Sequence, residues 1–432
     1  MRNASLWRGL LGLERAVVEG VEFDGDGPGG PVLVARVRPA KGPRGRCGRC
    51  EARSPWYDRG EGRRRWRALD LGSVRAELEA EAPRVRCREH GVVVAHVPWA
   101  RHGAGHTRDF DDTVGWLAVA CSKTTVTELM GIAWRTVGAI VKRVCADVDA
   151  VTDRFAGPRR IGIDEVSYKR GFQYLTVVVD HDTGRLVWAA PGRDRATLSR
   201  FFDALGAERA RALTHVSGDG ADWIAHVVGQ RAPQAVLCAD PFHVVAWATD
   251  CLDTVRRQIW NTARRSPGGT APRGRQAGRR QHLSRGDAKT LKRARWALWK
   301  NPEDLTDKQR EHLAWIVRTH PTLYRAYLLK EALRHVFKIK GEPGKHALDC
   351  WLAWAQRSRI PEFVELGRKI KRHLPAIHAS LDHGLSNALI ESVNTKIRLL
   401  TRIAFGFKDP HALIALAMLA LGGYRPPLPG RT

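Results

Sequence analysis

Three carboxylates, those of Asp164, Asp219 and Glu391, stand within or directly after strongly apolar patterns, so each would be carried by a rigid element. Magnesium prefers carboxylate oxygens and keeps several of its waters. Two Mg²⁺ ions about 4 Å apart can activate an attacking oxygen and neutralise a leaving oxygen. Three acidic residues are enough to hold such a pair for cleavage of a DNA phosphodiester, and a released 3′-OH could then attack a second DNA. Taken alone, a carboxylate such as that of Asp164 on a strand would more often be an ion-pair partner than a metal ligand.

A second acidic motif, Asp240-Pro-Phe-His243, leaves the second metal ligand open between Asp219 and Asp240. Asp219 follows the apolar run Leu213–Ser217, and Asp240 follows the next run, Ala235–Ala239. Asp219 suits the position expected in the fold, whereas Asp240 belongs to the more recognisable motif. We favour Asp219 as the ligand and expect Asp240 and His243 to support the site or to position DNA.

Two short motifs near the N-terminus point to a different metal. Cys47-Gly-Arg-Cys50 and Cys87-Arg-Glu-His90 are separated by a segment whose alternating pattern fits a β-hairpin. Three thiolates and one imidazole can complete a tetrahedral zinc site. Four protein ligands leave no open position, so we expect one structural Zn²⁺ that folds a domain too small to hold its own core. The alternative, four unrelated residues, would leave exposed thiols unexplained.

The segment Thr107–Asp149 changes to a helical period. Its apolar positions predict a helix, a short second helix, a turn at Gly131 and a third helix. This order suits a helix-turn-helix whose last helix enters a major groove, although any three-helix scaffold could share the spacing. The candidate DNA contacts on the last helix are Arg135, Thr136 and Lys142.

The patterns between Ile161 and Ala239 suggest how the carboxylates are brought together. They predict three strands, a helix, a strand, a helix and a strand, with a polar turn at Ser167–Gly171 after the first strand. This order is typical of an α/β, RNase H-like core, in which three antiparallel strands are extended by parallel ones. The first strand and the end of the fourth then lie side by side, which would bring Asp164 close to Asp219.

From Val244 onward the pattern is helical, which predicts a helical insertion into the core over 246–375. Arg256–Lys300 holds 14 Lys or Arg and one acidic residue, so it is expected to contact DNA. The candidates in its Gly- and Arg-rich middle are Arg273, Arg275, Arg279 and Arg280. After the insertion, Glu391 shares a helical face with basic and amide side chains, and its candidate DNA contacts are Asn394, Lys396 and Arg398. A solvated amphipathic helix would show the same stripe.

The whole composition favours a nucleic-acid partner. The formal net charge is +27, and a protein this basic is expected to bind a polyanion. Arginine-rich codon usage would explain the ratio of Arg to Lys but not the excess of bases over acids. The remaining cysteines stand singly, as in a reduced cytosolic protein. No signal pattern or membrane-spanning apolar run is found, so we expect a cytoplasmic protein without a membrane partner.

These motifs together resemble the bacterial insertion-sequence transposases of the DDE class, of the ISL3 family. The resemblance covers nearly the whole chain: the zinc motifs, the helix-turn-helix, Gly162-Ile-Asp164-Glu165, Asp240-Pro-Phe-His243 and Ser386-Asn387 through Gly406-Phe407. It implies an RNase H-like catalytic domain with a helical insertion, inverted-repeat binding by the N-terminal domains, and Mg²⁺-dependent cleavage and strand transfer. The chain departs from the family at His90 (commonly Cys), Pro241 (commonly Arg) and Ser392 (commonly Gly). None of these changes removes a carboxylate.

The sequence therefore predicts five parts: strands and a zinc domain over 1–100, a helix-turn-helix domain over 101–155, the core over 156–245 and 376–432, and the insertion between them. We expect a transposase that acts on inverted-repeat ends and target DNA as a dimer or higher oligomer, on the bacterial nucleoid. One alternative is a zinc-containing DNA-binding regulator with an inactive RNase H-like domain. Another is a nuclease that cuts but never joins. The three carboxylates argue against the first alternative, and the N-terminal DNA-binding parts argue against the second.

Overall fold

The computed structural model of the 432-residue chain describes residues 3–25, 30–265, 285–385 and 387–430. The candidate DNA contacts Arg273, Arg275, Arg279 and Arg280 lie outside the described residues. The chain divides into two compact units. The first unit comprises Met1–Arg154, Ser167–Gln173 and Lys396–Thr432, and the second comprises Phe155–Val166 and Tyr174–Thr395.

The N-terminal part of the first unit begins with a helix, α1 (Asn3–Leu10), followed by a four-stranded sheet in the order β1-β2-β5-β4. Its strands are β1 (Ala16–Asp24), β2 (Val32–Pro39), β4 (Arg63–Arg67) and β5 (Arg75–Glu81). β1 pairs antiparallel with β2, and the antiparallel pairing of β4 with β5 confirms the hairpin predicted between the zinc motifs. Alternate residues of β5 are buried with Trp66 in one apolar core, as expected for a sheet with one solvated face.

A second, smaller sheet in the first unit carries the zinc motifs. It consists of β3 (Trp56–Asp58), β6 (Arg84–Cys87) and β7 (Gly91–Val94), in the order β3-β6-β7. Cys47 and Cys50 precede β3, Cys87 ends β6, and His90 lies in the turn before β7.

Three helices follow as predicted: α2 (Arg108–Ala120), α3 (Lys123–Met130) and α4 (Trp134–Val151). Thr107 and Ser122 accept hydrogen bonds as N-caps of α2 and α3. Gly131 ends α3 in the left-handed conformation, with φ of 58°, which glycine adopts without a steric penalty. The C-terminal helix α17 (Pro410–Leu421) packs against both α4 and α2, so this helical group contains a fourth member from the far end of the chain.

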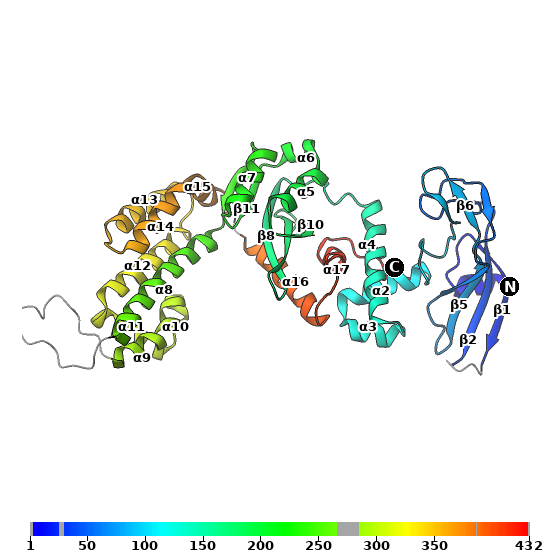
Figure 1. Cartoon of the computed structure of the whole chain (residues 1–432), viewed down its shortest axis with the longest axis horizontal. Coiled ribbons are helices and arrows are strands. Elements are labelled where there is room, and N and C mark those ends of the chain that lie inside the picture. The colour runs from blue at the N-terminus through cyan, green and yellow to red at the C-terminus, as the bar shows by residue number, and fades with distance from the viewer. Residues whose placement is uncertain (1–2, 26–29, 266–284, 386, 431–432) are drawn as a thin grey trace, which may run out of the picture. The chain divides into compact units, whose positions relative to one another are not determined.

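The second unit is built on a five-stranded sheet in the order β10-β9-β8-β11-β12 (Figure 1). Its strands are β8 (Arg160–Lys169), β9 (Gln173–Asp180), β10 (Leu186–Pro191), β11 (His215–Gly218) and β12 (Val236–Ala239). β10 is antiparallel to β9, whereas β11 runs parallel to both β8 and β12. This confirms the expected RNase H-like topology. β8 is longer than predicted and continues through Ser167 to Lys169, because this polar stretch still pairs within the sheet.

Helices cover both faces of this sheet. α5 (Arg195–Leu205), α6 (Ala207–Ala212) and α7 (Asp222–Arg231) share an apolar core with one face, on the side of Ile161 and Ile163. On the other face, α16 (Ala388–Ile403) lies so close to β8 that a Cβ on Gly162 would meet the side chain of Ile390 at 2.0 Å. Only glycine permits this approach, and it brings residues of α16 within reach of Asp164 on β8.

The rest of the second unit is helical, as predicted, and lies in the chain between β12 and α16 (Figure 1). Its elements are α8 (Pro241–Arg265), α9 (Arg285–Arg293), α10 (Arg295–Trp299), η1 (Pro302–Asp304), α11 (Asp307–Thr319), α12 (Pro321–Val336), α13 (Gly341–Arg357), α14 (Pro361–Arg372) and α15 (Leu374–His383). Helices α8 to α15 share one apolar core. In the part of the chain that the structure describes, no helix has the length and apolar character to cross a membrane.

Candidate active site and metal centre

The strand register places three aspartates side by side on neighbouring strands, with Asp164 within β8 and Asp219 and Asp240 directly after β11 and β12. Ser217 of β11 pairs with Gly162 of β8, and Gly218 pairs with Ala239 of β12. Continuing these registers sets Asp219 beside Asp164 on one side and beside Asp240 on the other. Because side chains alternate along a strand, all three aspartates project from the face that α16 covers.

Asp164 is buried, and both of its oxygens accept hydrogen bonds. Oδ1 accepts from the backbone N–H of Glu165 at 2.8 Å, and Oδ2 accepts from Asn394 Nδ2 at 2.8 Å. Burial raises the pKa of Asp164 to about 6, and the charges of Asp219 and Asp240 add to this effect. Each of these two oxygens has further lone pairs, so a bound cation would stabilise a charge that burial disfavours.

Asp240 already accepts three hydrogen bonds from protein donors. Its side chain is 1% exposed; Oδ1 accepts from the backbone N–H of Phe242 at 3.3 Å and of Asn387 at 3.1 Å. Oδ2 accepts from His243 Nδ1 at 2.7 Å, and this hydrogen bond raises the pKa of His243.

Asp219 is less constrained than Asp240. It is half-buried, and its Oδ1 accepts from the backbone N–H of Ala221 at 2.9 Å. Its Oδ2 has no hydrogen-bond partner among the described residues. The freer carboxylate beside Asp164 is therefore that of Asp219.

Glu391 lies on the sheet-facing stripe of α16 between two residues that touch the aspartates. Asn387 contacts Asp240 and Asn394 contacts Asp164, and the spacing 387, 391, 394 keeps all three residues on one helical face. In the described part of the chain, the oxygens of Asp164, Asp219 and Glu391 do not all lie within 4.8 Å of one another. A pair of ions about 4 Å apart does not require this, because no single ion needs all three residues.

Several polar groups at this site were not predicted from the sequence. Asn387 is fully buried and accepts from Ser217 Oγ at 2.7 Å, and Ser217 Oγ lies 2.8 Å from His181 Nε2. Within the described residues, three buried polar atoms here have no hydrogen-bond partner: Asn394 Oδ1, Asn387 Nδ2 and Glu165 Oε1. Unpaired buried oxygens beside carboxylates suit a hydrated Mg²⁺ ion. In the sequence, the only indication that Asn387 belongs to the site was its position in the C-terminal motif that begins with Ser386-Asn387.

The predicted DNA contacts differ in accessibility. Arg135, Lys396 and Arg398 are exposed, and Thr136 is partly exposed. Lys142 is also exposed but forms an ion pair with Asp409 at 2.8 Å. Asn394 does not fit its predicted contact with DNA, because it is only 2% exposed and donates to Asp164.

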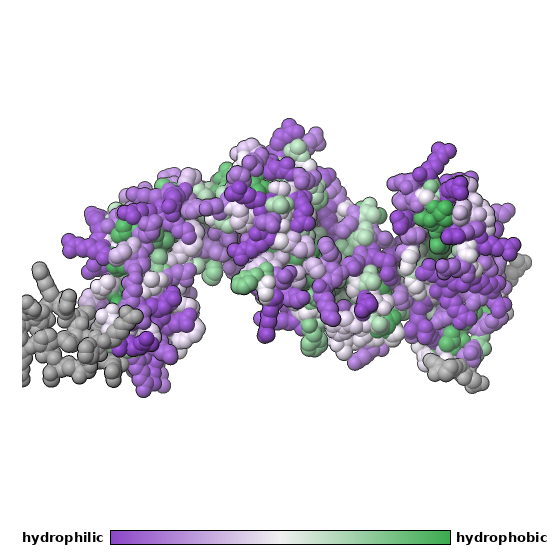
Figure 2. Space-filling view, in the orientation of Figure 1, coloured by the Kyte–Doolittle hydropathy of each residue, from purple (hydrophilic) through white to green (hydrophobic). Residues whose placement is uncertain are grey.

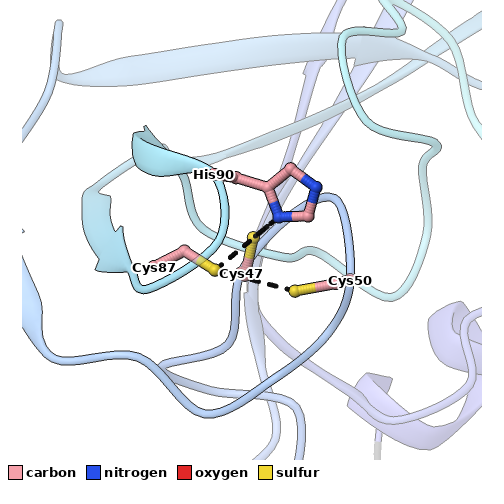
Figure 3. A group of neighbouring side chains, drawn as sticks. All are labelled: Cys47, Cys50, Cys87 and His90. Carbon is pink, nitrogen blue, oxygen red and sulfur yellow. Dashed lines mark hydrogen bonds between the residues drawn. The ribbon is translucent and has the colours of Figure 1, made fainter.

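The four zinc candidates converge from two loops of the small sheet (Figure 3). Cys50 Sγ lies 3.7 Å from Cys87 Sγ, and His90 Nδ1 lies 3.8 Å from Cys47 Sγ and 3.7 Å from Cys87 Sγ. Sulfur ligands about 2.3 Å from a tetrahedral zinc would be separated by about 3.8 Å. Hydrogen bonds from the turn at His90 lower the pKa of Cys87 to about 6, which favours the thiolate that zinc binds. The cluster thus fits a closed, structural zinc site.

Comparison with known proteins agrees with this arrangement. A family model described as transposase of the DDE type, for ISL3 elements, matches residues 161–417. Models for the helix-turn-helix domain of the ISL3 transposase family and for the zinc finger of the IS204, IS1001, IS1096 and IS1165 transposases match residues 95–145 and 43–90.

Two curated relatives extend the similarity over most of the chain. The transposase for insertion sequence element IS1557 of Mycobacterium tuberculosis is 65% identical over 439 aligned positions, covering 100% of this chain and 98% of the relative. The transposase for IS1001 of Bordetella parapertussis is 25% identical over 350 positions, covering 80% of this chain and 81% of the relative. With its adjacent aspartates, zinc cluster and helix-turn-helix in the matched regions, the chain belongs to the ISL3 family of DDE transposases.

Proposed function

We propose that this protein binds the inverted-repeat ends of an insertion sequence, cleaves DNA there in a Mg²⁺-dependent reaction, and joins the released 3′ ends to target DNA. The observation that carries the proposal is the register of β8 and β11, which sets Asp164 beside Asp219 on the face covered by α16. A DNA-binding regulator with an inactive core would have no need of unpaired oxygens around these carboxylates.

Asp164, Asp219 and Glu391 are the proposed ligands of two Mg²⁺ ions. The bound ions would supply activation of the attacking oxygen and neutralisation of the leaving oxygen. Asp240 is assigned a supporting role, because its oxygens are already occupied by backbone and imidazole donors.

The chain's own residues would orient this chemistry. Asn394 holds one oxygen of Asp164 in place, so the other lone pairs of that carboxylate keep a fixed direction. The hydrogen bond to Asp240 raises the pKa of His243 and so favours its protonated form near the carboxylates, where a DNA phosphate would enter.

DNA binding is divided among several parts in this proposal. The zinc and helix-turn-helix domains over 1–100 and 101–155 bind the ends, with Arg135, Thr136 and Lys142 as contacts. Lys396 and Arg398 of the core meet DNA near the site, and the basic insertion over 246–375 grips flanking or target DNA. Pairing two ends requires a dimer or higher oligomer, acting in the cytoplasm on the nucleoid.

Asp219→Asn and Asp240→Asn test the ligand assignment. We expect Asp219→Asn to lower the rate of end cleavage by about 1000-fold or more, because a metal ligand supports several kcal/mol of transition-state stabilisation. Asp240→Asn should lower the rate of end cleavage by only about tenfold. It weakens the hydrogen bond that holds His243 but leaves the proposed metal ligands in place. The measurement is single-turnover cleavage of a labelled duplex carrying the element's end, with Mg²⁺ titrated.

The reverse order of the two effects would move the second ligand to Asp240. If the wild type binds the ends specifically but does not cleave them, the alternative of a DNA-binding regulator with an inactive core is favoured. Cleavage without any joined product on a supplied target duplex would favour a nuclease. Thermal melts of both variants control for folding.

A further inference from the structure

Basic and aromatic side chains on two packed helices form a strip beside the carboxylate site. We propose that this strip, formed by His243 and Trp247 of α8 and by Lys369, Arg372 and His373 of α14, binds backbone phosphates of the DNA strand that enters the site. Lys369 is its central contact. The inference rests on the proposed function and names a surface through which the same site would hold its substrate.

The amine of Lys369 packs against the face of an aromatic ring. Its Nζ lies 3.6 Å from the ring centre of Trp247, and the ring of His373 lies 5.6 Å from that of Trp247. The side chain is half-buried, and burial lowers the pKa of its amine. Trp247 attracts the cation through its ring face, but it supplies no negative charge.

No carboxylate forms an ion pair with Lys369 among the described residues. By contrast, Lys142, Lys330 and Lys345 each have an acidic partner within 4.0 Å. Asp222 and Asp250 act on Lys369 only at longer range. A half-buried ammonium without a counter-ion is unfavourable, and an anion brought by a ligand would relieve that cost.

The side chains of Lys369 and Trp247 lie next to the proposed metal site. The ring of Trp247 lies 3.5 Å from the position that a Cβ on Gly220 would take, and Gly220 directly follows Asp219. His243 stands one helical turn before Trp247, so both lie on the same face of α8. The strip therefore begins at the carboxylates.

The packing of α14 on α8 adds further basic side chains to the strip beside the site. Cys251 Sγ contacts the backbone oxygen of Glu362 at 3.5 Å, while Trp247 contacts Lys369 and His373. The two helices thus run side by side in opposite directions. Arg372 lies three residues after Lys369 on the same face of α14, is exposed, and has no ion-pair partner in the described part of the chain. Two neighbouring cations beside the proposed phosphodiester-cleaving site suit a DNA backbone.

Lys369→Met removes the charge and keeps an unbranched side chain against Trp247. Its control is Arg368→Met, since the neighbouring Arg368 is exposed and pairs with Glu365 at 3.0 Å. We measure affinity for the end duplex in Ca²⁺, across a salt series. Lys369→Met should bind roughly tenfold more weakly, as for loss of one charged hydrogen bond, with a salt slope smaller by about one. Arg368→Met should change neither quantity.

Single methylphosphonate substitutions in the duplex locate the contact. At one or two positions near the scissile phosphate, neutralisation should weaken the wild type roughly tenfold and leave Lys369→Met unaffected. Equal sensitivity of both proteins at every position, or unchanged affinity of Lys369→Met, overturns the proposal. If a thermal melt shows that Lys369→Met does not fold, Arg372→Gln tests the same strip at an exposed residue. An unchanged affinity of Arg372→Gln for the end duplex also overturns the proposal.

The failure of this inference can be told from failure of the proposed function. Wild-type cleavage of the unmodified duplex in Mg²⁺ tests the function. If the wild type cleaves and the Lys369→Met variant binds and cleaves equally well, the proposed phosphate-binding strip is rejected and the proposed function stands.

Discussion

Asp164 shows how the site depends on partners that lie far away in the chain. Its carboxylate is buried, carries a pKa raised to about 6, and is oriented by an asparagine 230 residues later. Glu165, the next residue, has a pKa raised by burial to about 7 and is held by Arg193 at 2.9 Å. Buried acids of this kind destabilise a fold, so their presence marks a site shaped for a cation rather than for stability.

These pKa values predict how stability depends on pH in magnesium-free buffer. Between the ordinary value of 3.8 and the raised value of about 6, the folded state binds more protons at Asp164 than the unfolded state does. The free energy of unfolding therefore falls as pH rises through this window. Asp164→Asn should raise the unfolding free energy at pH 8 by on the order of 2 kcal/mol, and should have little effect at pH 4.

Urea unfolding at the two pH values measures this effect. Asp307→Asn, at a side chain that is 94% exposed, is the matched control and should change stability at neither pH. A lower stability of Asp164→Asn at pH 8 would contradict the account. Chelators are avoided, because they would also strip the zinc cluster.

His90 offers a second test at the scale of one residue. His90→Cys restores the ligand that is common in the family, so zinc should remain bound, because four thiolates also form a closed tetrahedral site. His90→Ala removes a ligand, and we expect loss of zinc together with unfolding of the small sheet. Metal analysis of the purified proteins and protease sensitivity near Cys50 and Cys87 give the outcome. Full zinc content in His90→Ala would show that His90 is not a ligand.

At the scale of elements, α4 is held between two partners. Val137, Ile140 and Val144 are buried in the helical group, and α17 packs along another side, with Leu416 near Val141. Arg135 is exposed and available for DNA, whereas the exposed Lys142 is paired with Asp409. α17 therefore belongs with the helix-turn-helix rather than standing apart, and it supplies Asp409 next to a predicted DNA contact.

Removing the charge of Asp409 should strengthen DNA binding. The pair with Lys142 is 45% and 42% exposed, so it contributes less than about 1 kcal/mol to stability. Asp409 also caps α17 by accepting from the backbone N–H of His411, and asparagine can do the same. Asp409→Asn should thus leave the melting temperature nearly unchanged. It frees Lys142 for a phosphate, and end affinity should rise about threefold at low salt.

A double-mutant cycle checks this prediction. In a Lys142→Ala background, Asp409→Asn should have no effect on end affinity, because the freed cation is absent. The same gain in both backgrounds would mean that Asp409 acts through general charge repulsion from DNA. A Lys142→Ala protein that binds ends as well as the wild type would remove Lys142 from the DNA interface.

At the scale of the whole molecule, the net charge favours DNA binding, and the chain connectivity determines which elements form the carboxylate site. The net charge of +27 gives the protein a long-range attraction for DNA, and hydrophilic side chains dominate the visible face of both units (Figure 2). Each unit has its own apolar core. The insertion between β12 and α16 separates Asp219 from Glu391 in the chain, yet packing of Ile390 against Gly162 returns α16 to the strand that carries Asp164.

The sequence by itself determined the features that depend on local spacing and periodicity. These include the zinc cluster, the three helices ending in α4, the strand order of the core, and the adjacency of Asp164 and Asp219 that this order requires. Ligand spacing and strand alternation are short-range properties, so residue types report them directly.

Only the tertiary structure decided which helix face meets which strand. It buried Asn394 on Asp164 instead of exposing it to DNA, placed Asn387 against Asp240, and seated Lys369 on Trp247. It also joined Lys142 to Asp409 across 267 residues. Such contacts follow from the packing of whole elements, and an amphipathic pattern specifies that a face is buried without specifying its partner.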